Sequence, residues 1–165
     1  MSSNYNTQQY EMKNTICQYD GEKSILLCKS KVSNRKLWIK KLSGITQVLN
    51  IIEDEKRFYI ACESGDINGE FIALQQESGI TDWYIPGKSY MQVIFKNYIY
   101  LIFIDENNIY YLIKVNLNTG KKIWHHTVNE DISEYRFYKK RILLIYDSGY
   151  NESISILTGN VIKVT

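Results

Sequence analysis

The two histidines, His125 and His126, are adjacent in the sequence and are its most obvious acid–base or metal-binding side chains. Neighbouring residues on a β-strand point to opposite faces, so this pair cannot easily share a metal ion. We expect one ring to be buried beside Trp124 and the other to be exposed. Neither has an identifiable nucleophile or carboxylate partner. The pattern therefore favours structural histidines.

No nucleotide-binding, hydrolase or zinc motif accompanies the histidines. The sequence lacks a Ser-His-Asp order, a P-loop, a G-x-G-x-x-G, an H-E-x-x-H and a paired zinc motif. We therefore predict a protein that is not an enzyme, with no catalytic residue, no metal ligand and no cofactor.

The segment Asp66-Ile67-Asn68-Gly69-Glu70 has oxygen-bearing side chains at alternate positions and a glycine suited to a sharp turn. These are features of a calcium-binding loop. The segment lacks the remaining ligand spacing and the distal bidentate glutamate of such a loop. Asn-Gly is also a strong hairpin signal. We predict a hairpin turn, with calcium binding as the alternative.

Further acidic residues occur in predicted loops. They are Asp54-Glu55, Asp105-Glu106-Asn107-Asn108, Asn129-Glu130-Asp131 and Glu152. These groups fall at different positions relative to the predicted strands, so we expect a solvated surface. The alternative is an acidic patch that meets a basic partner such as a nuclease.

Tyrosine is unusually frequent, with 14 residues in a chain of 165. So many rings cannot all be buried, and exposed tyrosines are common in protein–protein hot spots. Tyr150 lies in a predicted turn between Gly149 and Asn151 and is the strongest candidate for exposure. Together with the loops outside the repeated pattern, it gives the predicted partner-binding residues, which are Asp66, Asn68, Glu70, Asn129, Glu130, Asp131 and Tyr150.

Composition and charge limit the class of protein. The chain is 44% hydrophobic and carries a net charge of +2, as expected of one soluble domain. The basic clusters Lys40-Lys41, Lys121-Lys122 and Lys139-Lys140-Arg141 are short and adjoin predicted turns, where lysines are usually solvated. The longest apolar run, Tyr98 to Ile104, is far shorter than the roughly 20 residues of a membrane helix. We expect no nucleic-acid partner and no membrane partner.

Three cysteines, Cys17, Cys28 and Cys62, form no C-x-x-C pair. The N-terminal residues are polar and carry no signal-peptide core. We therefore predict a cytoplasmic protein with free thiols that are mostly buried.

Two features recur along the chain and predict the elements that position these residues. Tryptophans occur at 38, 83 and 124, each four residues after Asn34, Gly79 or Gly120. A fourth copy of the turn, Thr158-Gly159, is followed at the same distance by Lys163 in place of tryptophan. Polar turns followed by apolar strands recur with a similar period. We predict one all-β domain of four repeats, approximately 8–42, 48–86, 90–128 and 132–165.

Each repeat is expected to hold four short antiparallel strands, giving about 15 strands and no helix. In the first repeat the position of one strand is less clear, and 8–12 is the candidate segment. Four-stranded units of about 40 residues are typical of β-propeller blades.

Two segments, 73–83 and 115–124, resemble the A-x-D-x-x-T-G-x-x-x-W blade motif of the quinoprotein (PQQ-like) propellers. Gln75 and Asn116 replace the aspartate of the motif. The resemblance implies blades packed face to face, with each tryptophan docked against the next blade. No cofactor ligand of that family is recognisable.

Members of that family usually have more than four blades. This leaves three arrangements: a tight ring, an open arc, or two chains joined as half-rings. We favour an open or dimerising arc, whose faces and edges are natural binding surfaces.

The predicted function is that of a non-enzymatic module that binds a protein partner. Its specific form is a bacterial immunity or inhibitor protein that neutralises a toxin. The alternatives are a propeller that binds a small ligand or carbohydrate and a structural dimerisation module, so a homodimer is a further partner hypothesis.

Overall fold

The structure is a computed structural model that describes residues 7–66 and 68–164. It contains four antiparallel sheets of four strands, here called blades 1 to 4. Blade 1 consists of β1 (Thr7–Glu11), β2 (Thr15–Asp20), β3 (Ile25–Ser30) and β4 (Lys36–Lys41). Blade 2 consists of β5 (Gln47–Glu53), β6 (Arg57–Ser64), β7 (Asn68–Gln75) and β8 (Thr81–Pro86). Blade 3 consists of β9 (Lys88–Phe95), β10 (Tyr98–Ile104), β11 (Tyr110–Asn116) and β12 (Lys122–Val128). Blade 4 consists of β13 (Ile132–Phe137), β14 (Arg141–Tyr146), β15 (Asn151–Ser155) and β16 (Val161–Val164).

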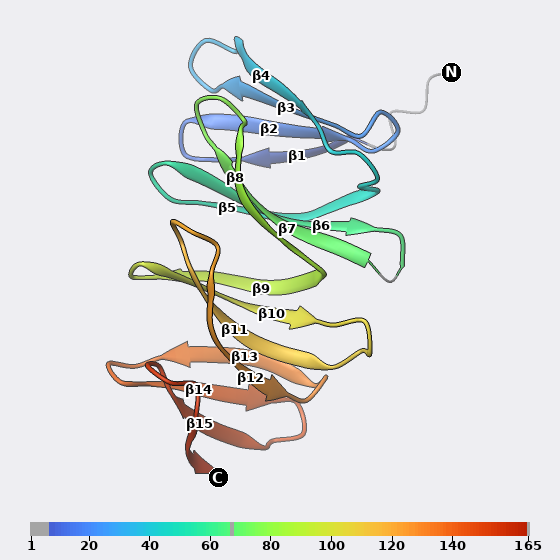
Figure 1. Ribbon diagram of the computed structural model, residues 1–165. Coiled ribbons are helices and arrows are strands. Elements are labelled where there is room, and N and C mark those ends of the chain that lie inside the picture. The colour runs from blue at the N-terminus through green and yellow to red at the C-terminus, as the bar shows by residue number, and fades with distance from the viewer. Residues whose placement is uncertain (1–6, 67, 165) are drawn as a thin grey trace.

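The predicted all-β class is confirmed, and the strands follow one another in each sheet in chain order. The first strand of blade 1, β1, lies within one residue of the segment expected for it. The blades are stacked in chain order, and the two ends of the stack do not meet (Figure 1). Among the described residues, no helix is long and apolar enough to cross a bilayer.

The order of the strands brings the connections together at two opposite edges of the stack. The first turn of a blade (for example β5–β6) and its third turn (β7–β8) share one edge, because consecutive antiparallel strands reverse direction each time. Backbone hydrogen bonds join these turns, from Gln76 N to Lys56 O at 2.9 Å and from Leu117 N to Asn97 O at 3.4 Å. The second turns and the connections between blades occupy the opposite edge, as Figure 1 shows for β10–β11 and β6–β7.

Three tryptophans join the blades. The indoles of Trp38, Trp83 and Trp124 are buried, and each N–H donates to a backbone carbonyl of the next blade. The acceptors are the carbonyls of Gln76, Leu117 and Ile156, at 2.7, 2.9 and 3.2 Å. Each acceptor lies three residues before the glycine that ends its turn. The predicted docking of each tryptophan on the neighbouring blade is thus present in all three joints.

The glycine of each joint is required by both backbone and space. Gly79, Gly120 and Gly159 have positive φ angles of 72, 70 and 75°, which L residues other than glycine rarely adopt. A Cβ atom at these positions would lie 2.6, 2.5 and 2.7 Å from the ring of the preceding blade's tryptophan. The turn therefore specifies the joint as much as the tryptophan does.

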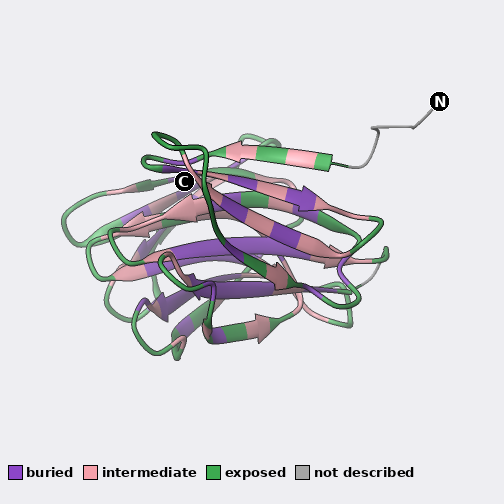
Figure 2. Cartoon of the chain, turned by 90° about the horizontal axis from the view of Figure 1, so that it is seen from above, coloured by how far each residue is buried: buried purple, intermediate pink, exposed green. Residues whose placement is uncertain are grey.

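Apolar side chains fill the space between the blades. Three clusters of buried residues lie along the stack, and the middle one includes Tyr59, Phe71 and Trp83 from blade 2 with Ile99 and Leu101 from blade 3. Figure 2 shows buried residues along the centres of strands and exposed residues in the loops. The three cysteines are free and buried, as predicted. Cys17 lies directly opposite Cys28 in the β2–β3 register.

The two terminal faces of the stack carry polar residues at positions that are apolar in the inner interfaces. When the blades are aligned by their strand pairing, Lys29 of blade 1 is equivalent to Leu74, Val115 and Ile154 of the other blades. In the same alignment, Gln18 of blade 1 is equivalent to Ile60, Leu101 and Leu144. Asn34, with a φ of 56°, occupies the position of the joint glycines.

At the other end, Lys163 of blade 4 lies opposite Ser153, whereas blades 1 to 3 have a tryptophan at this position, opposite Cys28, Ala73 or Lys114. The chain thus contains three complete joints and neither half of a fourth. Polar residues at these positions disfavour the stacking of a further blade, although Leu37 and Ile39 of blade 1 also remain exposed.

Candidate functional surfaces

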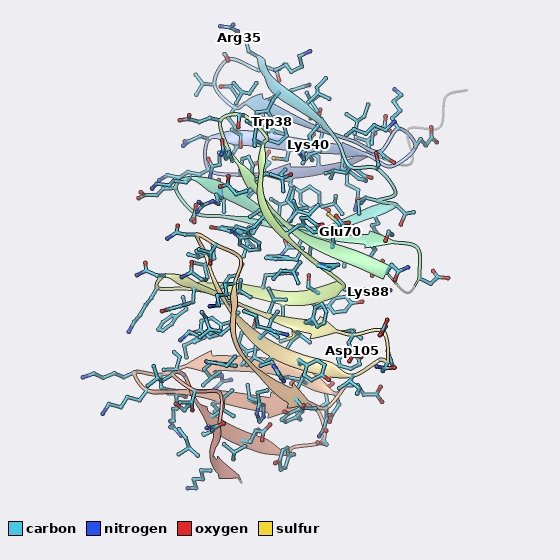
Figure 3. All side chains as sticks on the ribbon, viewed as in Figure 1. Arg35, Trp38, Lys40, Glu70, Lys88 and Asp105 are labelled. Atoms are coloured by element: carbon cyan, nitrogen blue, oxygen red, sulfur yellow. The ribbon has the colours of Figure 1, made fainter. Side chains whose placement is uncertain are left out.

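One edge of the stack is acidic. The second turns of the blades and the connections between blades contain seven acidic residues and one basic residue among the described positions. The acidic ones are Glu22, Asp66, Asp105, Glu106, Glu130, Asp131 and Asp147, and the basic one is Lys23. We call this set of connections the acidic edge. Asp105, in the β10–β11 turn, is labelled at this edge in Figure 3.

Most of the predicted partner-binding residues lie at the acidic edge. Asp66 and Asn68 are exposed beside the β6–β7 turn, and Asn129, Glu130 and Asp131 form the connection from β12 to β13. The loops were expected to fall at scattered positions, but Asp66, Asp105 and Asp131 share one edge because the two kinds of connection meet there. Asp54 and Glu55 lie at the opposite edge, in the β5–β6 turn.

Hydrogen bonds fix the loops around Tyr150. The carboxylate of Asp131 accepts from Ser148 N at 3.1 Å, and its carbonyl accepts from Asp147 N at 2.9 Å. These bonds hold the β12–β13 connection against the β14–β15 turn. Tyr150 is exposed, as predicted, at 37%, but it is not the most exposed tyrosine, because Tyr84 and Tyr138 reach 61% and 41%. Its ring centroid lies 5.3 Å from that of Tyr146. The structure therefore brings Tyr150 and the Asn129–Asp131 loop together.

Asp66 and the start of β7 at Asn68 lie in the β6–β7 hairpin that was predicted, and Ile67 between them lies outside the described residues. The ammonium group of Lys88 donates a hydrogen bond to the carbonyl of Asp66 and lies 3.6 Å from a carboxylate oxygen of Glu63. A cation of the protein itself thus occupies the vicinity that a calcium ion would need. Among the described residues, no three His, Cys, Asp or Glu side chains are grouped to hold a metal.

The opposite edge is basic. Its connections, the first and third turns of every blade, contain eight basic and three acidic residues. The basic ones are Lys13, Lys31, Arg35, Lys56, Lys96, Lys121, Lys139 and Lys140, and the acidic ones are Asp54, Glu55 and Glu77. We call these connections the basic edge. The chain's small net charge of +2 therefore hides two edges of opposite sign.

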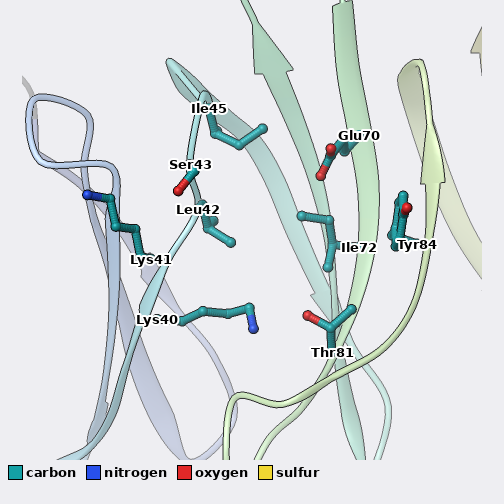
Figure 4. Close-up of a pocket in the computed structure, with 9 residues that line it drawn as sticks. All are labelled: Lys40, Lys41, Leu42, Ser43, Ile45, Glu70, Ile72, Thr81 and Tyr84. Atoms are coloured by element: carbon teal, nitrogen blue, oxygen red, sulfur yellow. The ribbon is translucent and has the colours of Figure 1, made fainter.

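A cleft of about 380 Å³ separates blades 1 and 2 near the acidic edge (Figure 4). Leu42, Ile45 and Ile72 give it an apolar floor, and the exposed ring of Tyr84 lines one side. Lys40 and Glu70 also line it, and neither forms an ion pair with another described residue. Glu70, predicted as a partner-binding residue, thus lies in this cleft and apart from Tyr150.

Sequence reasoning missed Lys40 and Tyr84 as cleft residues. Lys40 occupies the register position that Ile85 has in blade 2 and His126 in blade 3. Once the strand register is known, a charged residue at a position that faces the next blade can be recognised in the sequence as a candidate cleft residue.

The corresponding space between blades 3 and 4 is closed by a polar network. His126 Nε2 lies 2.9 Å from Glu152 Oε1, and the hydroxyl of Tyr146 donates to the same oxygen at 2.8 Å. Burial and the nearby Glu152 carboxylate raise the pKa of Tyr146. Glu152 was expected among the exposed acidic residues, but its side chain is only 8% exposed because it faces blade 3.

The two histidines lie on opposite faces of β12, as predicted. His126 shares the face of Trp124, whereas His125 is exposed, with its ring 5.4 Å from that of Tyr111. Neither has a nucleophile among its hydrogen-bond partners in the described residues. His126 thus packs between blades 3 and 4, and His125 packs against Tyr111 on the surface of blade 3.

Comparison with known proteins identifies the fold. No protein-family model and no curated protein sequence matches the chain. The quinohemoprotein alcohol dehydrogenase from Comamonas testosteroni aligns with a TM-score of 0.70 at 11% identity, over 97% of this chain and 35% of the enzyme. The computationally designed Ika4 protein aligns with a TM-score of 0.66 at 10% identity, over 94% of both chains.

The chain has the fold of quinoprotein-type propeller repeats. A europium-containing methanol dehydrogenase agrees, with a TM-score of 0.68 and 11% identity. The alignment covers 96% of this chain and 41% of that enzyme. It therefore spans less than half the length of the dehydrogenases that it resembles, as an open four-blade arc.

The two side chains that replace the aspartate of the quinoprotein-type motif form local hydrogen bonds. Asn116 takes the place of the motif's aspartate, and its carboxamide oxygen accepts from Asn118 N at 2.9 Å and from Thr119 N at 3.2 Å. An aspartate at this position would accept the same bonds. Gln75, at the equivalent place, instead donates to Asp82 at 2.8 Å. Among the residues aligned with the motif, these side chains stabilise turns.

Proposed function

We propose that this chain is a non-enzymatic interaction module whose acidic edge binds a basic surface of a protein partner. The observation that carries the proposal is the concentration of seven acidic residues and one basic residue in the connections of one edge. Complementary charge speeds association and selects against wrong partners.

Tyr150 supplies the apolar component of this surface. Its exposed ring packs against that of buried Tyr146, with the ring centroids 5.3 Å apart. Interfaces obtain most of their binding energy from a few aromatic or arginine anchors, and rigid rings lose little entropy on binding. The specific form of the proposal is a basic toxin as the partner, with the chain as its neutralising immunity protein.

Affinity capture with matched variants tests the proposal. The double variant Glu106→Lys/Glu130→Lys reverses two exposed charges on the acidic edge, and Lys139→Glu/Lys140→Glu reverses two on the basic edge. We expect a protein partner to be retained at micromolar concentration by the wild type and the second variant and lost by the first. Tyr150→Ala should weaken the same partner at least tenfold. Recovery of no partner, or equal loss with both double variants, would contradict the proposal.

A second candidate function is the binding of a small ligand in the cleft between blades 1 and 2. The unpaired Lys40 and Glu70 and the exposed ring of Tyr84 favour it, because ligand sites combine an apolar lining with a few polar groups. Trp38 lies in the same joint, so its fluorescence can report binding. Titration with a panel of sugars, amino acids and flat heterocycles is expected to change that fluorescence in the wild type and not in Glu70→Gln/Lys40→Met. A flat response to the whole panel would exclude this function.

A further inference from the structure

We propose that the basic edge is a second binding surface, which takes the phosphate backbone of a nucleic acid. It lies opposite the acidic edge and shares none of its connections. The basic clusters looked like isolated, solvated lysines in the sequence. The structure brings Lys121 to the same edge as Lys139 and Lys140, because the first and third turns of a blade lie side by side.

Every blade contributes cations to this surface. Blade 1 supplies Lys31 and Arg35, blade 2 supplies Lys56, and blade 3 supplies Lys96 and Lys121. Stacked sheets lie about 10 Å apart, so four blades give a basic strip of roughly 30 Å. A nucleic-acid backbone carries negative charge of regular spacing over such a length. A folded protein surface seldom does, which favours nucleic acid as the occupant.

Most of these cations are free to meet an external anion. Within the described residues, Lys56, Lys96 and Lys121 form no ion pair. The same is true of Lys139 and Lys140, which are exposed at the tip of the β13–β14 turn.

The acids at this edge offset the cations only in part. The carboxylate of Asp54 accepts from Lys56 N and Arg57 N at 2.8 Å each and from the hydroxyl of Tyr59 at 2.6 Å. These bonds hold the carboxylate in its own turn, but it keeps its negative charge, so the edge carries eight cations against three anions. Glu55 and Glu77 remain as the exposed acids of the edge.

An aromatic platform lies within the strip. Tyr138 is 41% exposed, and the guanidinium carbon of Arg141 lies 4.7 Å from its ring centroid. Exposed rings beside cations stack on the bases of single strands, whereas phosphate contacts fix the backbone. The surface thus fits a single strand better than a duplex.

Fluorescence anisotropy with labelled oligodeoxythymidylate of about 20 nucleotides tests the inference on the full chain. For four phosphate contacts, the affinity for a single strand should fall about fiftyfold between 50 and 200 mM salt. Lys139→Glu/Lys140→Glu should weaken binding at least tenfold at 50 mM salt. Tyr138→Ala should weaken the single strand more than a duplex of equal length.

The matched control is Lys23→Glu/Lys41→Glu, which makes the same change in net charge but removes cations that lie away from the basic edge. It should leave the affinity within threefold of the wild type. Equal losses in the two double variants would show that overall charge alone drives binding and would overturn the assignment. So would absence of binding at 50 mM salt, or equal affinity for poly-L-glutamate, which would indicate an acidic protein as the occupant. Retention of the wild-type thermal melt verifies that each variant is folded.

Discussion

The indole of Trp83 lies flat against Gly120 of the next blade, so closely that a Cβ on the glycine would be 2.5 Å from the ring. Gly120 has a φ of 70°, and the indole N–H donates to the carbonyl of Leu117, three residues earlier. One short turn therefore provides both the contact surface and the hydrogen-bond acceptor for the joint between blades 2 and 3.

The first prediction separates these two demands on the glycine. Gly149 also has a positive φ, 87°, but nothing lies within 4 Å of the position of its Cβ. Gly149→Ala should cost only the backbone strain, about 1–2 kcal/mol. Gly120→Ala should cost about 1–3 kcal/mol more, because the new methyl group overpacks the joint. Urea denaturation of both variants measures the difference. Equal losses in the free energy of unfolding would show that the indole moves aside without cost.

The terminal faces give the second prediction. Since Lys29, Asn34 and Lys163 replace the apolar, glycine and tryptophan positions of a joint, the wild type should stay monomeric over a hundredfold range of concentration. The variant Lys29→Leu/Asn34→Gly/Lys163→Trp restores both halves of the joint. It should associate head to tail as its concentration rises. Light scattering measures both, with Asn34→Gly alone as the control, and a dimeric wild type would refute the capping role of these faces.

Lys114 gives the third prediction. The residue is buried, and its ammonium group lies 4.1 Å from the ring centroid of Tyr98 and donates to Ile156 O at 2.9 Å. Burial lowers the pKa of Lys114, so the folded state binds this proton less tightly than the unfolded state. The resulting penalty is full below the lowered pKa and disappears as the pH rises past the unfolded value of about 10.4.

We therefore expect Lys114→Met to be more stable than the wild type by up to about 1 kcal/mol at pH 7, with methionine filling a similar volume. The advantage should shrink as the pH approaches 10. Denaturation at both pH values provides the measurement. A large loss at pH 7 would show that the two contacts of the ammonium group outweigh its desolvation.

Asp82 gives the fourth prediction. Its carboxylate lies 2.5 Å from Arg57 Nε and accepts from Gln75 at 2.8 Å, and these hydrogen bonds lower the pKa of Asp82. A lowered carboxyl pKa contributes stability above the unfolded pKa of about 3.9, and the contribution is lost as the pH falls through the folded value.

Asp82→Asn should thus cost about 0.5–1 kcal/mol at neutral pH, and the difference should begin to shrink near pH 4 and vanish as the pH falls through the lowered pKa of Asp82. Acid titration of the urea midpoint tests this. Glu77→Gln removes an exposed carboxylate that forms no ion pair in the described part of the chain, and serves as the control. An unchanged difference between pH 7 and pH 3 would rule out the Asp82 contribution.

The repeat in the sequence predicted much of the fold because its landmarks are local. The turn glycines and the tryptophans four residues later fix the ends of β7, β8, β11 and β12. The strand β1 was harder to place because its burial pattern alternates only between exposed and half-buried residues. The polar residues Lys29, Asn34 and Lys163 can be recognised as departures from the joint pattern only when register positions are compared across blades.

The candidate surfaces were predictable only in part. The acidic loops and Tyr150 could be selected as residues outside the repeat. Their grouping could not, because residues such as Asp66 and Asp131 meet only through the alternation of the connections between two edges. Glu152 shows the opposite case, since its charge looked exposed in the sequence but its position faces His126 across a joint.

The open stack also determines how the chain can change in length. Each blade is built from consecutive strands and joined to the next by a Trp–Gly contact and a cluster of apolar side chains, so none of these joints depends on the first and last strands meeting. Such a structure can fold outward from any blade without the entropic cost of closing a ring. An inner blade can be duplicated or removed together with its own tryptophan and glycine. The basic and acidic edges would then lengthen or shorten together, so the number of blades sets the length of both surfaces.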